Sequence, residues 1–191
     1  MTKARVILIG PHGAGKSSLA RALVADKSQP FKYDLEQLVT TRARRPGEGD
    51  DEYQFISEDE FTAQRNNYLM VQINRGVAWS YALAAERPLA DGEIRVYVVL
   101  AETAEFLRQQ YPEETIVCAI LPPSMEVLEQ RLISRDTTIS PAELAFRMEL
   151  MTADIQKAHD SADIVFYNQD GLDHSKQRLA ALIEERLRSK S

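Results

Sequence analysis

The sequence predicts an α/β fold, in which a parallel β-sheet flanked by helices carries an inserted flap and a lid. Four short apolar runs, at residues 4–9, 95–100, 115–121 and 163–167, are separated by segments with helical patterns. Strands that alternate with helices in this way pair in parallel through right-handed crossovers. A glycine-rich loop joins the first run to the first helix, and 191 residues suffice for one domain with a sizeable core.

That loop, at residues 10–17, reads Gly-Pro-His-Gly-Ala-Gly-Lys-Ser and matches the phosphate-binding pattern G-x-x-x-x-G-K-S. It stands between an apolar strand and a helical pattern at 16–26, which is the setting that a P-loop NTPase-type sheet requires. Glycines let backbone N–H groups point inward, and the helix N-terminus adds partial positive charge. The predicted nucleotide-binding residues of the loop are Gly10, Pro11, His12, Gly13, Ala14, Gly15, Lys16, Ser17 and Ser18.

Lys16 and Ser17 supply the chemistry of this loop. We expect Lys16 to reach the β- and γ-phosphates of ATP and the Ser17 hydroxyl to hold Mg²⁺. His12 occupies one of the variable positions of the motif. We therefore favour a structural role in the loop over a role as a catalytic base. The alternative for the whole loop is a glycine-rich turn before an ordinary helix, which the Lys-Ser pair and the preceding strand disfavour.

The segment after the first helix departs from the strand–helix alternation. It contains turn residues, a charged loop and short β-like runs. We interpret residues 32–91 as an inserted acceptor-binding flap. In order, we expect strands at 35–41 and 53–56, a helix from a capping box at Ser57–Glu60 to about residue 65, strands at 68–74 and 77–83, and a short helix at 83–91.

The second half of the chain returns to the alternation. We expect a lid at 135–145 and assign residues 1–31, 92–134 and 146–191 to the core of one domain. In order, the elements are a strand at 95–100, a helix at 102–111, a strand at 115–121, a helix from Ser124 to about 134, a long helix from a capping box at Ser140–Glu143 to about 161, a strand at 163–167 and a helix at 172–189.

Composition narrows the classes of partner. The formal net charge is −6, whereas nucleic-acid binding depends on neutralising phosphates, so we expect no nucleic-acid partner. The single cysteine, Cys118, excludes an internal disulfide. The longest apolar runs are far shorter than the roughly 20 residues of a membrane helix, and the first is too short for a signal peptide. We expect a cytoplasmic monomer or homodimer that acts on small molecules.

Two groups of arginines suggest further anion sites. Arg42, Arg44 and Arg45 form a tight cluster, which is either a second phosphate site facing the loop or a solvated loop balanced by nearby acids. Arg131 and Arg135 share one helix face, and Arg147 follows the predicted lid. This second group suits stabilisation of a transferring phosphoryl group, although surface arginines on helices are common.

These residues resemble the guanylate kinase family over most of the chain. The resemblance implies that Arg42, Arg45, Tyr53 and Tyr81 hold an acceptor phosphate. It also implies that Lys16, Arg135 and Arg147 serve the transferred phosphoryl group, while Arg131 and Asn168 lie on the ATP side. The motifs that carry it are residues 10–17, Thr40-Thr41-Arg42, Arg45-Pro46-Gly47-Glu48, Tyr53–Ser57 before Phe61, Pro122-Pro123-Ser124, and Arg131 with Arg135.

Several residues depart from the pattern of that family at the positions that read guanine. Gln72 replaces the usual glutamate, and an amide cannot accept two guanine N–H donors as a carboxylate does. Leu83 occupies about the position at which the family usually has Ser or Thr. Either Leu38 or Val39 occupies a position at which the family usually has a serine. The two acids expected after the middle strand are absent from 96–101, and Glu102 is the nearest acid.

The sequence therefore predicts an ATP-dependent kinase whose acceptor carries a phosphate, with GMP as the acceptor that the family implies. Ribose 1,5-bisphosphate phosphokinase is a second relative that also lacks the guanine-reading residues, although it matches residues 40–61 less closely. A non-catalytic guanylate-kinase-like binding module is the third alternative, because one missing acid lies near the metal in the family.

Overall fold

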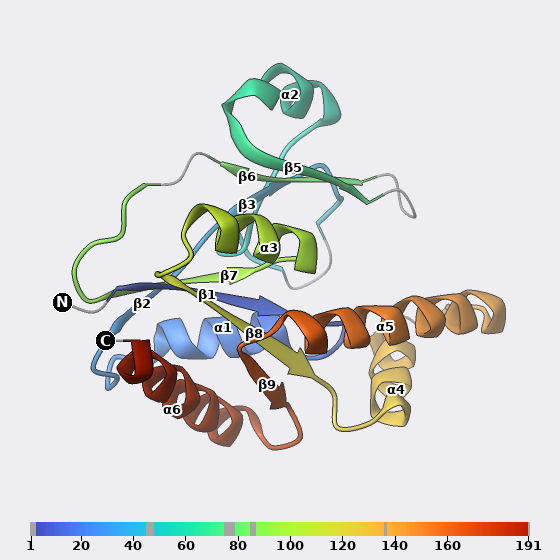
Figure 1. The fold of residues 1–191 in the computed structure, drawn as a ribbon. Helices are drawn as coiled ribbons and strands as arrows, with labels where there is room; N and C mark the ends of the chain where they lie inside the picture. The colour runs from blue at the N-terminus through green and yellow to red at the C-terminus, as the bar shows by residue number, and fades with distance from the viewer. Residues whose placement is uncertain (1–2, 45–47, 75–78, 85–86, 136, 191) are drawn as a thin grey trace.

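A five-stranded parallel sheet forms the centre of the structure, a computed structural model that describes residues 3–44, 48–74, 79–84, 87–135 and 137–190 (Figure 1). The strand order is β2-β7-β1-β8-β9, and within the described residues each neighbouring pair of strands in this sheet is parallel. The predicted fold class is therefore confirmed. The strands are β1 (Ala4–Ile9), β2 (Lys32–Leu35), β7 (Glu93–Val98), β8 (Thr115–Leu121) and β9 (Ile164–Tyr167).

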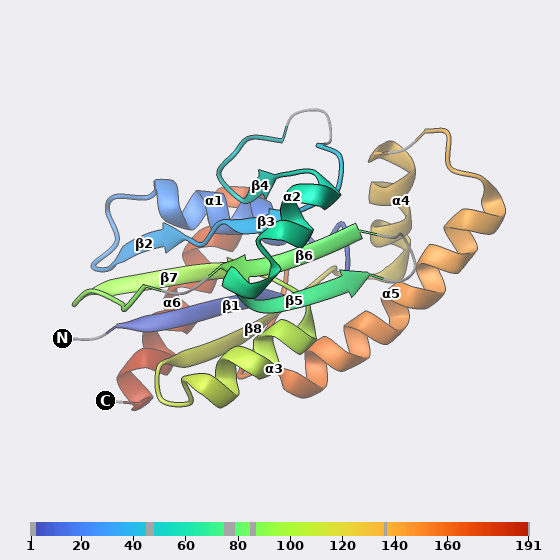
Figure 2. The same ribbon diagram turned by 90° about the horizontal axis from the view of Figure 1, so that it is seen from above.

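Helices cover both faces of this sheet, as the apolar runs require. Parallel strands that are buried on both sides read as nearly continuous apolar stretches, and β1 and β8 are buried throughout. Figures 1 and 2 show α4 and α5 at the end toward which β1 and β8 point. The helices are α1 (Lys16–Ala25), α3 (Ala101–Gln110), α4 (Met125–Arg135), α5 (Pro141–Ser161) and α6 (Leu172–Lys190).

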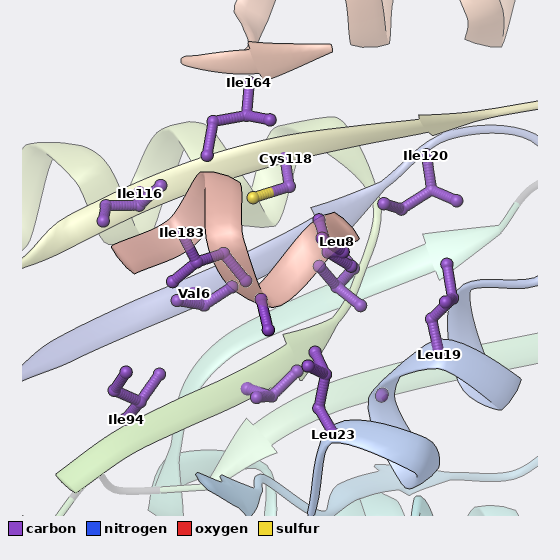
Figure 3. Close-up of a cluster of buried hydrophobic side chains, with 14 of the residues drawn as sticks. Val6, Leu8, Leu19, Leu23, Ile94, Ile116, Cys118, Ile120, Ile164 and Ile183 are labelled. Atoms are coloured by element: carbon purple, nitrogen blue, oxygen red, sulfur yellow. The ribbon is translucent and has the colours of Figure 1, made fainter. Parts of the chain in front are cut away.

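Alternate residues of each strand belong to different cores. Val6 and Leu8 pack with α1 and α6, in the cluster that Figure 3 shows around Cys118. Ile7 and Ile9 point the other way and pack with residues of α3 and α5. This period of two is the expected geometry of a strand, and here it divides the apolar residues between the two faces of the sheet. Cys118 is fully buried, as its strand setting indicates.

A second sheet of four strands lies on the α3 side of the main sheet (Figure 1). Its order is β4-β3-β6-β5, with an antiparallel β5–β6 pair, and it encloses a small core around Phe61. Its elements are β3 (Leu38–Thr40), β4 (Tyr53–Phe55), α2 (Glu58–Ala63), a 3₁₀ turn (Arg65–Asn67), β5 (Tyr68–Asn74) and β6 (Trp79–Ala84).

Two predicted elements of this region are wrong. The strand expected at 35–41 is two strands: β2 pairs with β7 in the main sheet, whereas β3 pairs with β4 and β6 in the second. The helix expected at 83–91 is also wrong, because β6 continues through Ala84 and described residues 87–91 are not helical. The second sheet spans residues 38–84, a shorter stretch than the expected insertion.

The two predicted capping boxes have different outcomes. At α2, Ser57 accepts a hydrogen bond from the Glu60 amide, and the Glu60 carboxylate accepts from the Ser57 amide, so the box is complete. At α5, Ser140 accepts from the Glu143 amide, but the Glu143 carboxylate pairs with Arg147 instead. The second box is therefore only a serine cap. No helix in the described part of the chain has the length and apolar character to cross a membrane.

Candidate functional site

The phosphate-binding loop follows β1 directly, and the packing around it demands glycine at two positions. Gly10 has a φ of 131°, and a Cβ there would lie 2.3 Å from the carbonyl oxygen of Ile120 on β8. Gly15 has a φ of 94°, and its Cβ would lie 2.3 Å from Nδ2 of Asn168. Both conformations strain other residues. The glycines of the motif therefore serve close approach as well as curvature.

Side chains from distant parts of the chain hold the loop in shape. Nζ of Lys16 donates to the carbonyl oxygens of Gly10 and Pro11, at 2.7 and 2.9 Å. Asn168, just after β9, donates from Nδ2 to the Ala14 carbonyl at 2.8 Å. Arg131 of α4 donates from Nη1 to the Gly13 carbonyl at 3.1 Å. Both residues expected on the ATP side thus contact the loop directly.

A cavity of about 620 Å³ opens between this loop and the second sheet. It brings together residues that the sequence separates by up to about 160 positions. Of the predicted site residues, those that line it are His12, Gly13, Gly15, Lys16, Ser17, Ser18, Arg42, Tyr53, Gln72, Tyr81, Arg131 and Asn168. Gly10, Pro11 and Ala14 are not among its lining residues and shape the loop from behind.

Arg42, Tyr53 and Tyr81 form a cluster on the flap side of the cavity. The guanidinium carbon of Arg42 lies 5.2 Å from the centre of the Tyr53 ring, and the Tyr53 and Tyr81 rings meet edge to face at 6.0 Å. Burial raises the pKa of Tyr53, and the adjacent Glu52 carboxylate raises it further, so its hydroxyl keeps its proton. Protonated phenols and a guanidinium are hydrogen-bond donors, which suits an anionic ligand.

Arg42 is held in place by Glu48 and is not a solvated surface charge. It is only 3 % exposed, and its Nη1 and Nη2 donate to the two carboxylate oxygens of Glu48 at 2.8 and 3.1 Å. Burial lowers the pKa of Arg42, but the paired carboxylate outweighs that effect, so the side chain stays charged. Arg44 instead pairs with Asp50 on the exposed loop. Arg45 lies outside the described residues.

Gln72 of β5 lines the cavity and stands opposite Tyr81 in the β5–β6 register. Its amide is fixed by two residues of α3: Thr103 Oγ1 donates to Oε1, and Nε2 donates to the Glu102 carboxylate, both at 3.1 Å. Glu102 also pairs with Lys157 of α5. Thr103 was not predicted as a site residue, and its position within α3 gave no signal of this contact.

Part of the cavity wall is apolar. Leu38 and Leu83 line the cavity, as do the three residues from Val98 to Leu100 that replace the acids expected after β7. The open choice between Leu38 and Val39 is decided by strand alternation, because Val39 points into the small core around Phe61. The leucine therefore stands where the resemblance places a serine.

Glu52 is a cavity residue that the sequence pattern did not reveal. It is 4 % exposed, and its Oε1 accepts a hydrogen bond from the Ser17 hydroxyl at 2.9 Å. Its Oε2 accepts from Nη2 of Arg21, on α1, at 3.3 Å. Arg21 also pairs with Asp51. In the sequence Glu52 is one of several acids in a charged loop, and only the fold separates it from the others.

The three arginines predicted to serve the transferred phosphoryl group, Arg131, Arg135 and Arg147, differ in their position relative to the cavity. Arg131 lines the cavity. Arg147, on the first turns of α5, pairs with Glu143 at 2.5 Å and is not among the lining residues. Arg135 ends α4, but its side chain is not described. Of the two arginines whose side chains are described, Arg131 contacts the phosphate loop and Arg147 does not line the cavity.

Comparison with known proteins agrees with this architecture. The family model described as guanylate kinase matches residues 2–186. The guanylate kinase of Brucella melitensis is 34 % identical over 188 residues, which cover 96 % of this chain and 83 % of that protein. The guanylate kinase of Haemophilus influenzae is 35 % identical over 187 residues, covering 95 % and 88 %.

Comparison with solved structures also finds a guanylate kinase. The crystal structure of guanylate kinase from Anaplasma phagocytophilum has a TM-score of 0.74 against 97 % of this chain and 87 % of that one, at 20 % identity, and so shares the fold. The phosphate loop, the second sheet and the cavity between them lie within the span of the family match. The chain therefore belongs to the guanylate kinase family and is an ATP-dependent phosphotransferase of the nucleoside monophosphate kinase type.

Proposed function

We propose that the protein transfers the γ-phosphoryl group of ATP to the phosphate of GMP. One observation carries the proposal: a single cavity has the phosphate-binding loop on one wall and the cluster of Arg42, Tyr53 and Tyr81 on the other. Two anion-binding surfaces across one cavity suit a donor and an acceptor that must meet. Positioning and charge neutralisation then supply the rate, without a protein nucleophile.

The proposed roles rest on the lining of the cavity and, for Arg45, Arg135 and Arg147, on the family resemblance. The loop amides and Lys16 bind the β- and γ-phosphates, for which Lys16 exchanges its carbonyl partners for phosphate oxygens. Arg42 and the two tyrosines donate to the acceptor phosphate, with Arg45 completing this set. Arg131 lies at the loop already. Arg135 and Arg147 reach the transferring group when residues 135–145 close as a lid and exclude water.

The residues at the loop also fit a magnesium ion. Mg²⁺ prefers oxygen ligands and is commonly bound by one or two protein oxygens together with substrate phosphates. Among the described residues no group of three or more His, Cys, Asp or Glu could hold a metal alone, so a shared site is the suitable kind. The Ser17 hydroxyl would be its protein ligand. When bound, the ion neutralises charge that develops on the phosphate oxygens.

A sugar phosphate is the second candidate acceptor, because the side chains of Leu38, Leu83 and Val98–Leu100 on the cavity wall cannot hydrogen-bond to a guanine base. Guanine carries two N–H donors on one edge, and the described residues of this wall offer it no carboxylate. Ribose 1,5-bisphosphate has no base to be read. We also propose that the enzyme works in the cytoplasm, as a monomer or homodimer, on free small molecules.

An assay of ADP release across acceptors tests the proposal. The panel holds GMP, AMP, IMP and ribose 1,5-bisphosphate, each with ATP and MgCl₂. GMP is expected to give the highest kcat/KM. A preference for ribose 1,5-bisphosphate would transfer the assignment to the second candidate, and binding of ATP without turnover on any acceptor would indicate a non-catalytic module.

The Lys16→Ala variant tests the phosphate loop in the same assay. Removing its ammonium should lower kcat at least about 100-fold with every acceptor, the scale seen when one transition-state donor is lost. Lys27→Ala is the matched control, because Lys27 is exposed beyond the other end of α1, donates to the Val24 carbonyl and is not among the residues that line the cavity. Turnover of Lys16→Ala like that of the wild type would remove the role proposed for the loop.

A further inference from the structure

The carboxylate of Glu52 touches the phosphate loop from the flap. Its Oε1 lies 2.9 Å from the Ser17 hydroxyl oxygen, and the whole residue is 4 % exposed. Glu52 begins the segment that continues as β4, whereas Ser17 is in the first turn of α1. The contact therefore joins the two walls of the cavity at the oxygen that is expected to bind Mg²⁺.

The other carboxylates at the cavity have different partners. Among the described residues, the acids that line it are Glu48, Glu52 and Asp170. Glu48 is paired with Arg42, and Asp170 is paired with Arg178. The strand end that would carry acids, Val98–Leu100, is apolar. Glu52 is thus the lining carboxylate in contact with Ser17.

We propose that Glu52 supplies a second protein oxygen to the Mg²⁺ of the bound nucleotide, beside Ser17. Ligands on adjacent corners of an octahedral Mg²⁺ site, each about 2.1 Å from the ion, lie about 2.9 Å apart. The Ser17 and Glu52 oxygens have that separation. The inference rests on the nucleotide-binding part of the proposed function, and it places a metal ligand on the acceptor flap.

Burial of this carboxylate supports a partner of positive charge. A buried carboxylate needs compensation, and in the structure Arg21 supplies part of it at 3.3 Å from Oε2. The other partners of this carboxylate are neutral hydroxyls: Ser17 donates to Oε1, and the Tyr53 hydroxyl also hydrogen-bonds to Glu52. A divalent ion shared with the nucleotide phosphates would neutralise Glu52 from the Oε1 side while Arg21 keeps Oε2. Binding of the metal nucleotide would then fix the flap residue next to Tyr53.

Calorimetric titration of ADP into the full chain tests this inference without any acceptor. The measured quantity is the ratio of ADP affinity in MgCl₂ to ADP affinity in EDTA. Glu52→Gln keeps the shape of the side chain but loses its charge. In this variant the ratio should fall at least about tenfold, which is the loss of metal affinity typical when a residue that supports a metal site is changed. Affinity in EDTA should be unchanged or higher, because a negative charge near the phosphates is gone.

Asp51→Asn is the matched control, because Asp51 also pairs with Arg21 but does not contact Ser17. It should keep the wild-type ratio. A wild-type ratio in Glu52→Gln would overturn the proposal, and so would an equal loss of affinity in both buffers, which marks a structural support. If circular dichroism shows that Glu52→Gln is not folded, Glu52→Asp replaces it. The shorter side chain should lower the ratio, and an unchanged ratio would contradict the proposal.

The outcome is independent of which acceptor is used. An acceptor panel without turnover would count against the proposed reaction, yet the magnesium ratio would still be measurable on ADP alone. Conversely, GMP turnover with an unchanged ratio in Glu52→Gln would leave the reaction standing and remove only the role of Glu52.

Discussion

Gln72 shows at the scale of one residue how neighbours decide what a side chain offers a ligand. Its amide oxygen accepts from Thr103 and its amide nitrogen donates to Glu102, so its orientation is set by α3. One lone pair and one N–H remain for a ligand. That combination of one acceptor and one donor fits a purine edge that itself has one donor and one acceptor.

Restoring a carboxylate at position 72 should favour guanine only if Glu102 is changed as well. Gln72→Glu alone would set two carboxylates about 3 Å apart, and like charges so close raise the pKa of one of them. Gln72→Glu combined with Glu102→Gln avoids this repulsion. The double variant should raise the ratio of kcat/KM for GMP to that for AMP by roughly tenfold or more.

The single variant Glu102→Gln provides the control for that comparison. It removes the acid without creating a guanine acceptor, so its GMP to AMP ratio should stay close to that of the wild type. Equal ratios in the wild type and the double variant would show that Gln72 does not face the base of the acceptor.

The site depends on the β1–α1 loop, in which glycine is required both for a positive φ and for close approach to neighbouring atoms. Glycine substitutions can separate these two requirements. Gly92 also has a positive φ, of 78°, but a Cβ there meets nothing within 4 Å. Gly92→Ala should cost about 1–2 kcal/mol of unfolding free energy from backbone strain alone. Gly10→Ala should cost at least roughly 2 kcal/mol more, because its Cβ collides with the Ile120 carbonyl.

Urea unfolding followed by circular dichroism measures both variants. Gly10→Ala should also weaken ADP binding, because Gly10 belongs to the phosphate loop. Gly92→Ala should not, because Gly92 is not among the residues that line the cavity. Equal destabilisation of the two variants would show that crowding by β8 adds nothing to the backbone preference.

The start of β7 carries an ion network that makes stability depend on pH. Burial would raise the pKa of Glu93, but hydrogen bonds from Arg87, the Ala90 amide and Arg95 lower it to about 2. A lowered pKa stabilises the fold above the unfolded value near 4.5, and this contribution disappears as pH falls from about 4.5 to about 2.

Glu93→Gln should therefore destabilise the protein by roughly 1–3 kcal/mol at pH 7 and by progressively less toward pH 3. Urea midpoints of the variant and the wild type between pH 7 and pH 3 measure the difference. A difference that stays constant over this range would mean that the ionised carboxylate of Glu93 contributes no stability.

For the whole molecule, the placement of two anion-binding surfaces across one cavity predicts that donor and acceptor act together. A ligand that joins adenosine and guanosine through a chain of phosphates would contact both surfaces, and it should stabilise the fold more than ADP or GMP alone. At about 100 times its dissociation constant, the expected rise in Tm is roughly 5–10 °C.

Thermal unfolding with MgCl₂ measures this rise, and small-angle scattering should show a smaller radius of gyration for the ligand complex because the flap and lid close. A linked ligand that stabilises no more than the better of its two halves would contradict simultaneous occupation of the two surfaces.

Local features of the sequence determined most of the elements and the donor half of the site. The phosphate loop was predictable because its motif, strand and helix are contiguous, and the apolar strands because each is buried on both faces. Ser57 began a helix as its capping box indicates, since that contact spans three residues. The family-like segment around Arg42 and Tyr53 likewise predicted a cluster that the cavity brings together.

Contacts between distant residues decided the rest. The division of 32–40 into β2 and β3, the choice of Leu38 over Val39 at the cavity, and the meeting of Glu52 with Ser17 all depend on which strand pairs with which. A shift of one residue in register turns every side chain of a strand to the other face, and no local pattern sets that register. The sequence alone therefore determined the chemistry of the phosphate loop, whereas the tertiary structure decided which side chains stand opposite it.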